Sequence, residues 1–176
     1  MRIAIAGAGI AGLTAAIALS RRGFAVEVHE REPELAEIGA GIQLAPNAME
    51  MLGELGLGAI LNGAVFPEAI EIREAHGGAL LTRIPLGATA LARYGNPYCL
   101  IHRADLQSAL LAAARGDARI ALRLGSEARD VAADLSGVSF RAAGLSIAAD
   151  LLVVADGIHS RLRTEVFAHP GPPPLP

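Results

Sequence analysis

The sequence contains no lysine, no tryptophan and only one cysteine, Cys99. A single cysteine excludes an internal disulfide and a cysteine-based zinc site, and Cys99 is expected to be a small buried apolar residue. Aromatic residues make up 3% of the chain, so the core must be built from Ala, Leu, Ile and Val. The 15 basic residues are all arginines, they form no cluster, and the net charge is −3. There is therefore no electrostatic basis for binding nucleic acid or an anionic membrane.

The chain does contain ample apolar material, because 52% of its 176 residues are hydrophobic. This content offsets the entropy of ordering and excludes disorder for most of the chain. The length is close to the ~150 residues of one domain. We expect residues 1–168 to form that domain. Residues 169–176 are proline-rich and are expected to be a disordered tail or a linker.

An uncharged stretch from Ile3 to Ser20 superficially resembles a secretory signal. Three glycines interrupt it where a signal helix would be continuous, and glycine is costly inside a helix. A strand followed by a turn and a helix accounts for the glycines better. We therefore expect a cytoplasmic protein, and no other stretch approaches the length needed to cross a bilayer.

The first thirty residues alternate between strand and helix patterns. Arg2–Ala6 is a short apolar run typical of a strand, Ile10–Arg22 is rich in helix formers, and Ala25–His29 is a second strand. A strand, a helix and a strand in this space predict a βαβ unit with two parallel strands and a right-handed crossover. The fold class predicted is α/β.

The rest of the chain shows further short elements. Residues 31–45 are predicted to be a loop, and a β-hairpin is expected around His76-Gly77-Gly78. The last strand is apolar throughout, which predicts burial on both faces of a parallel sheet. The strands expected are Ala69–Ala75, Leu80–Ile84, Cys99–His102, Ile120–Leu124, Ala128–Ala133, Val138–Ala143 and Leu151–Ala155, and the helices are Pro46–Leu55, Ala104–Arg115 and Ile158–Val166.

A glycine motif, G-A-G-I-A-G, lies between the first strand and the first helix. Gly7 permits the tight turn, Gly9 has no side chain to block a pyrophosphate, and Gly12 lets the helix and the strand pack closely. The helix N-terminus attracts phosphate charge. The alternative is a glycine-rich turn in a generic α/β domain. The residues predicted to bind the cofactor here are Gly7, Gly9, Ile10, Ala11 and Gly12.

An acidic residue, Glu30, ends the second strand, 18 positions after Gly12. This is close to the ~20-residue spacing of a carboxylate that binds the ribose hydroxyls of a dinucleotide. A carboxylate would repel a 2′-phosphate at this site. Arg31 is a further candidate for cofactor contact. The alternative is a solvated charge cluster formed with Arg31 and Glu32, and the fingerprint alone leaves both NAD and FAD open.

Three later segments favour FAD. They are G-A-G-I-Q-L-A-P-N from Gly39, I-H-R-A-D-L from Ile101, and A-D-G-I-H-S from Ala155, followed by Arg163. With these segments in this order after the glycine motif, the sequence resembles the FAD-dependent aromatic-ring monooxygenases. In particular, it is similar to their salicylate-hydroxylase-like branch, from Met1 to about Phe167.

The resemblance implies a glutathione-reductase-like fold, in which a Rossmann core with a parallel sheet carries antiparallel β excursions. It implies FAD as cofactor, NAD(P)H as reductant, O2 as co-substrate and a small aromatic compound as the substrate that is hydroxylated. In such chemistry the cofactor carries the difficult step, while protein groups position it and exclude water. No side chain here is assigned as a catalytic acid or base.

The resemblance also implies roles for individual residues. The glycines of the motif would bind the FAD pyrophosphate, and Glu30 the adenosine ribose. Arg103 would reach the phosphate and ribityl region of the cofactor. Asp156 and Gly157 match a motif associated with both FAD and the nicotinamide. The loop beside the flavin and the substrate is matched by Gly41, Ile42 and Gln43.

Each of these residues has a plainer alternative. Arg103 would pair with Asp105 or Glu127 at the surface, which contributes ~0–1 kcal/mol. Asp156 would be the N-cap of the helix that follows it, alone or in addition to binding the cofactor. Gln43 would satisfy loop backbone groups. Ser160 and Arg163 would brace the turn after Asp156.

Other chemistry has little support in the sequence. The serines lack a nucleophile elbow, which leaves hydrolase chemistry without a basis. The histidines show no ligand spacing, so no metal site is predicted; they are His29, His76, His102, His159 and His169.

The sequence departs from the family in two respects. Val154 stands where members often have glycine. The family's substrate-covering sheet and its second Gly-Asp motif are also missing, so the fold is expected to be truncated. We expect the remainder in a second chain or a missing C-terminal half, and an incomplete sheet edge would favour self-association. The alternatives are a non-catalytic dinucleotide-binding remnant and the NAD-binding domain of another oxidoreductase.

Overall fold

The computed structural model describes residues 1–35, 40–58 and 63–167. The chain divides into two compact units, one of Met1–Ala36 with Leu110–Pro176 and the other of Glu37–Ala109. The tail predicted for residues 169–176 lies outside the described residues. Within the described part of the chain, no helix has the length and apolar character needed to cross a membrane.

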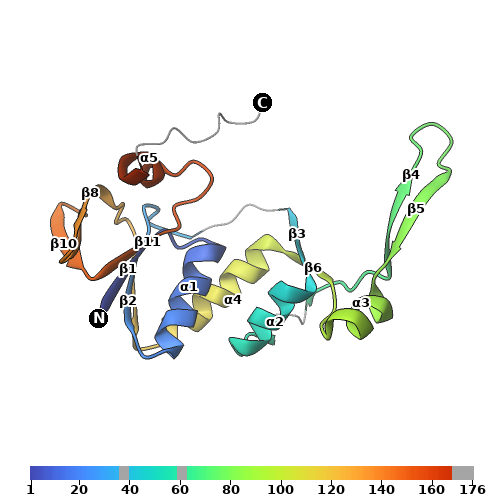
Figure 1. Ribbon diagram of the computed structural model, residues 1–176, viewed down its shortest axis with the longest axis horizontal. Coiled ribbons are helices and arrows are strands. Elements are labelled where there is room, and N and C mark those ends of the chain that lie inside the picture. The colour runs from blue at the N-terminus through green and yellow to red at the C-terminus, as the bar shows by residue number, and fades with distance from the viewer. Residues whose placement is uncertain (36–39, 59–62, 168–176) are drawn as a thin grey trace. The chain divides into compact units, whose positions relative to one another are not determined.

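A four-stranded parallel sheet forms the centre of the first unit (Figure 1). Its strands are β1 (Arg2–Ala6), β2 (Ala25–His29), β7 (Ile120–Arg123) and β11 (Leu151–Val154), in the order β11-β1-β2-β7. Helix α1 (Ile10–Arg21) connects β1 to β2 and packs against β2. The predicted βαβ unit with its parallel strands is therefore confirmed.

A second layer covers one face of this sheet. It is an antiparallel meander of β8 (Arg129–Asp134), β9 (Gly137–Ala142) and β10 (Leu145–Ala149), and helix α5 (Arg161–Phe167) packs on β8. Phe140 of β9 is 1% exposed and lies in a cluster with small alanines of β1 and β9 and with Leu162. Because the β1 side chains on this face, Ala4 and Ala6, are small, the two layers can approach closely around this one large ring.

The second unit is built from two short antiparallel pairs and two helices of its own. Strand β3 pairs with β6, and β4 pairs with β5 as the predicted hairpin. Helix α4 (Arg103–Arg115) follows β6 directly and runs into the first unit. The other elements are β3 (Gly41–Leu44), α2 (Pro46–Glu54), β4 (Ala69–Arg73), β5 (Leu80–Pro85), α3 (Gly87–Tyr94) and β6 (Cys99–His102).

Three sequence-based expectations need correction. Residues 41–44 are not loop but strand β3, because they pair with β6 far along the chain. Strand β11 is not buried on both faces; it is the end strand of its sheet, and Leu151 is 44% exposed. Strand β10 and helix α3 were not predicted. Cys99 is fully buried, as expected.

Candidate functional site

Two glycines of the motif that joins β1 to α1 lie where a side chain would clash with backbone atoms. Gly7 has φ +102°, and a Cβ there would lie less than 3.0 Å from the carbonyl oxygen of Ala155. A Cβ at Gly12 would meet the carbonyl oxygen of Gly7 equally closely. Both contacts involve backbone, which cannot move aside. These two glycines are therefore explained by packing within the protein.

Gly9 differs from its neighbours, because a Cβ there would meet nothing within 4 Å. It is the N-cap of α1, no side chain caps the helix, and the first turn contains no acidic residue. Ile10 is half-buried and Ala11 is exposed. The first turn of α1 thus has open space in front of it and a positive helix terminus behind that space, which suits an anionic group.

Glu30 directs its carboxylate at this loop. Its side chain is buried, Oε2 accepts a hydrogen bond of 2.7 Å from the backbone N–H of Ala8, and Oε1 accepts one of 3.0 Å from Glu32. A carboxylate has about four acceptor positions, so these two bonds leave capacity for hydroxyl donors. The solvated-cluster alternative does not describe Glu30. It does describe Arg31 and Glu32, whose exposed side chains form an ion pair of 3.1 Å.

The segment after β11 lies directly beside the glycine loop. The N–H of Ala155 donates to the carbonyl of Ala6 over 2.8 Å, and the Ala155–Asp156 backbone is the wall that a Cβ at Gly7 would strike. Gly157 has φ +91°, a conformation that favours glycine. The structure therefore brings two motifs from opposite ends of the chain together at the carboxyl ends of β1 and β11.

The helix after this turn begins later than predicted, at Arg161 rather than Ile158. Ser160 Oγ accepts a hydrogen bond of 3.0 Å from the N–H of Arg163, as an N-cap does. Asp156 also bonds to the first turn of α5, because its Oδ2 accepts a hydrogen bond of 3.3 Å from the N–H of Leu162. Its other oxygen, Oδ1, is buried and has no hydrogen-bond partner among the described residues. Such an atom is costly to bury unless a ligand or water satisfies it.

The remaining predicted residues lie in the second unit. Gly41, Ile42 and Gln43 form most of β3, and the hydroxyl of Tyr98 donates to Gln43 Oε1 over 2.5 Å. Arg103 begins α4 with an exposed side chain, and its backbone N–H donates to Ala40 at 3.2 Å. Because β3 pairs with the strand that runs into α4, these residues form one local group.

Sequence reasoning considered His29 only as a metal ligand and missed its structural position. It is 2% exposed, and Nδ1 lies 3.0 Å from the hydroxyl oxygen of Ser126, which is also buried. Its ring meets that of Phe140 edge to face, with the centroids 5.1 Å apart. Burial lowers the pKa of His29, the nearby Glu27 raises it, and Arg123 lowers it further. The signal available in the sequence was the alternation of β2, which puts Glu27 and His29 on one face.

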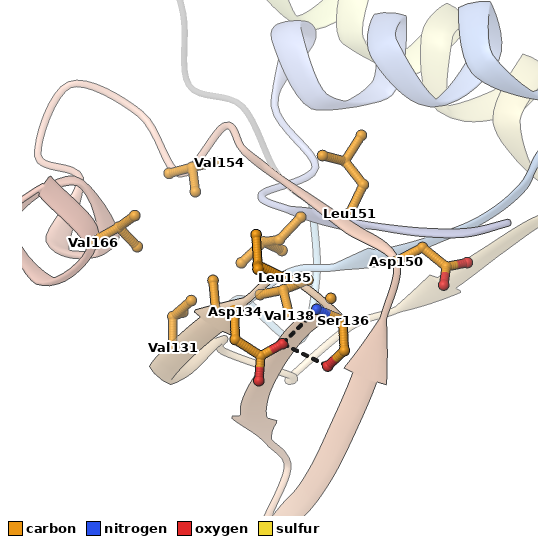
Figure 2. Close-up of a pocket in the computed structure, with 12 residues that line it drawn as sticks. Val131, Asp134, Leu135, Ser136, Val138, Asp150, Leu151, Val154 and Val166 are labelled. Carbon is orange, nitrogen blue, oxygen red and sulfur yellow. Dashed lines mark hydrogen bonds between the residues drawn. The ribbon is translucent and has the colours of Figure 1, made fainter.

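A separate groove of about 510 Å³ lies along the exposed edge of β11. Figure 2 shows Leu151 and Val154 of this strand, the β8–β9 turn at Leu135 and Val166 of α5 around it. Asp134 accepts hydrogen bonds from Ser136 at the turn. None of the predicted cofactor residues, all of which fall in the described ranges, lines this groove. It is a mainly apolar surface distinct from the glycine-loop site.

Comparison with known proteins adds three relationships. Residues 1–171 match a protein family described as FAD binding domain. The chain is 39% identical over 165 residues to the 3-hydroxybenzoate 6-hydroxylase of Polaromonas naphthalenivorans (strain CJ2), covering 93% of this chain and 41% of that protein. It is 46% identical over 169 residues to the 3-amino-4-hydroxybenzoate 2-monooxygenase PtnB3 of Streptomyces platensis, covering 92% and 41%.

A solved structure is similar as well. Klebsiella pneumoniae HpxO complexed with FAD and uric acid superposes with a TM-score of 0.80 and 32% identity, over 94% of this chain and 41% of that one. The chain thus spans about two fifths of the length of the relatives it matches.

Proposed function

This chain belongs to the FAD-binding domain family, and from that membership we propose that it is the FAD-binding portion of a flavin-dependent monooxygenase that hydroxylates a small aromatic compound. Two of the relatives named above are a 3-hydroxybenzoate 6-hydroxylase and a 3-amino-4-hydroxybenzoate 2-monooxygenase. We propose the same class of substrate, with NAD(P)H as the reductant. We propose this activity for a protein of the relatives' length.

One observation carries the cofactor assignment: Gly9 has open space at the start of α1, the adjacent Ala8 bonds to the buried carboxylate of Glu30, and Gly7 lies against the backbone of Asp156. The helix terminus suits a diphosphate, and a carboxylate with spare acceptor positions suits ribose hydroxyls. The unsatisfied Oδ1 of Asp156 supplies a further acceptor. These residues fit the adenosine diphosphate half of FAD.

Within this proposal each group of residues binds a different part of the cofactor. The backbone of Gly7–Gly12, including Ile10 and Ala11, receives the diphosphate, and Glu30 orients the ribose. Asp156 and Gly157 close the site from the β11 side. Arg31 is exposed and serves at most the outer rim of the adenosine.

Four further residues are proposed, from the resemblance, to contact the other half of the cofactor. Arg103 would bind the phosphate and ribityl region through charge-assisted hydrogen bonds, for which its guanidinium is suited. Gly41, Ile42 and Gln43 would lie beside the flavin, with Tyr98 fixing the amide of Gln43. FAD, once bound, supplies the redox and oxygen-transfer chemistry. The protein positions the cofactor and shields it from water.

The test is a titration of the purified 176-residue chain with FAD, followed by the visible flavin spectrum and by quenching of flavin fluorescence. Glu30→Gln should weaken binding roughly tenfold to a hundredfold, because a charge-assisted hydrogen bond contributes roughly 1.5–3 kcal/mol. The matched control is Glu32→Gln, which changes an exposed carboxylate two residues away. Binding that is absent, or equal losses in both variants, would contradict the assignment. Absence would favour a non-catalytic remnant.

A further inference from the structure

A buried polar pair lies directly beneath the proposed ribose-binding carboxylate. His29 ends β2 and immediately precedes Glu30, and its Nδ1 is 3.0 Å from Ser126 Oγ. Both side chains are almost fully buried, at 2% and 4% exposure. They are joined across two separate segments of the first unit, the end of β2 and the loop after β7.

The surroundings select one arrangement of protons in this pair. Nε2 of His29 has no hydrogen-bond partner within the described part of the chain, and it lies 3.8 Å from Glu27 Oε1. A proton on Nε2 therefore faces a carboxylate, whereas a lone pair there would be repelled by it. Nδ1 is then the acceptor, and the hydroxyl of Ser126 donates to it. The imidazole is neutral in this arrangement, as its burial favours.

Backbone hydrogen bonds connect the pair to the candidate site. The N–H of Ser126 donates to the carbonyl of Glu30 over 2.7 Å, and the N–H of Gly7 donates to the carbonyl of His29 over 2.7 Å. Glu30 is thus held by its own carbonyl on one side and by its carboxylate bond to Ala8 on the other. A shift of Ser126 would move the Glu30 backbone, and with it the carboxylate.

We propose that the His29–Ser126 hydrogen bond is a positioning device for Glu30, which fixes the direction of its carboxylate toward the glycine loop and thereby raises the affinity for the adenosine side of the cofactor. Neither side chain contacts the cofactor; both act through Glu30. This inference rests on the proposed function.

Packing alone does not require this pair. An apolar pair of the same shape would fill the space beside Phe140 without the cost of burying two polar groups and leaving Nε2 unsatisfied. A directional bond, by contrast, restricts the loop to one position relative to β2. A positioning role predicts an effect on FAD binding that passes through Glu30, and a packing role predicts an effect on stability alone.

The experiment is a double-mutant cycle on FAD affinity in the full 176-residue chain, with Ser126→Ala, Glu30→Gln and the combination of both. Titrations are made under conditions in which urea unfolding shows each variant to be folded. Ser126→Ala should weaken FAD binding roughly threefold to tenfold, the effect of losing one buried hydrogen bond. In the Glu30→Gln background the same change should have almost no effect, because the group that the pair positions is already lost.

His29→Phe provides a second route, since it keeps a ring against Phe140 and removes the hydrogen bond. It should reproduce the loss of affinity, and it replaces Ser126→Ala in the cycle if that variant does not fold. Ser139→Ala, at an exposed serine of β9, is the matched control and should leave FAD binding unchanged.

The outcomes separate the two proposals. If the unmodified chain does not bind FAD, the proposed function fails and this inference fails with it. If FAD binds and Glu30→Gln weakens it, but Ser126→Ala and His29→Phe change only the unfolding midpoint, the positioning role is overturned while the proposed function stands. An equal loss from Ser126→Ala in both backgrounds overturns the positioning role as well.

Discussion

Gly9→Ala is expected to weaken FAD binding while leaving the stability of the fold almost unchanged. A Cβ at Gly9 meets nothing within 4 Å, and the backbone there has φ −71° and ψ −177°, which alanine adopts freely. Removing glycine restricts the unfolded chain and stabilises by about 0.4–1 kcal/mol. Alanine is a poorer N-cap than glycine by a comparable amount, because the polar and glycine caps are preferred. The free energy of unfolding should therefore change by less than about 1 kcal/mol.

The same methyl group stands in the space proposed for the diphosphate. Forcing an extra methyl into a filled site typically costs about 1–3 kcal/mol, which is roughly a fivefold to hundredfold loss of FAD affinity. Gly12→Ala should behave in the opposite way, because its Cβ would strike the carbonyl oxygen of Gly7. That variant should lose stability first, and binding only in consequence.

The assay pairs FAD titration by flavin fluorescence with urea unfolding for each variant. Gly53→Ala is the matched control, since Gly53 lies in α2 and a Cβ there also meets nothing within 4 Å. It should stabilise the helix slightly and leave FAD binding unchanged. A folded Gly9→Ala chain that binds FAD as tightly as the unmodified one would refute the placement of the diphosphate.

Three further outcomes are expected. Arg103→Ala should weaken FAD binding by about 1–3 kcal/mol, measured by the same titration, while Arg93→Ala in the same unit should not. Because the pKa of His29 is lowered in the fold, the unfolded chain binds a proton first on acidification. Stability should therefore fall as the pH drops below about 6.5, and His29→Phe should reduce this dependence in urea unfolding at two pH values. The FAD-loaded chain alone should oxidise NADH or NADPH slowly or not at all, followed by nicotinamide absorbance; rapid oxidation stimulated by an aromatic substrate would contradict this.

The elements predicted correctly are those whose own residues decide their structure. The βαβ unit was predicted because three local signals are consistent: the apolar run of β1, the helix formers of α1 and the glycines between them. Pro46 at the first turn of α2 likewise marks where that helix begins.

The elements missed depend on partners elsewhere in the chain, distant in sequence for β3 and adjacent for β10. Strand β3 contains Gly41 and is only four residues long, and it exists because it pairs with β6. Strand β10 is rich in alanine, which has weak strand propensity, and it is set by pairing with β9. Helix α3 is short, buries only Ala90, follows Pro85 closely and begins at Gly87, and both residue types are typical of loops. Composition alone does not show which segments pair in the fold.

The candidate site likewise contains features that the sequence could predict and features that it could not. Spacing predicted that Glu30 binds the ribose, which stays a prediction; the structure places its carboxylate against the N–H of Ala8 in the glycine loop. Spacing could not show that Ser160 rather than Asp156 caps α5, because that depends on where the turn ends. It also gave no sign of the bond between His29 and Ser126, which are far apart in the sequence.

The close approach of Gly7 to Ala155 has a consequence for synthesis. The glycine loop is translated early. The Ala155–Asp156 backbone that packs against Gly7 is translated only later, with β11 and the turn after it. At typical elongation rates this delay is on the order of ten seconds. A chain that lacks β11 has only one side of the proposed site, so under the proposed function FAD would bind only after the sheet has been assembled.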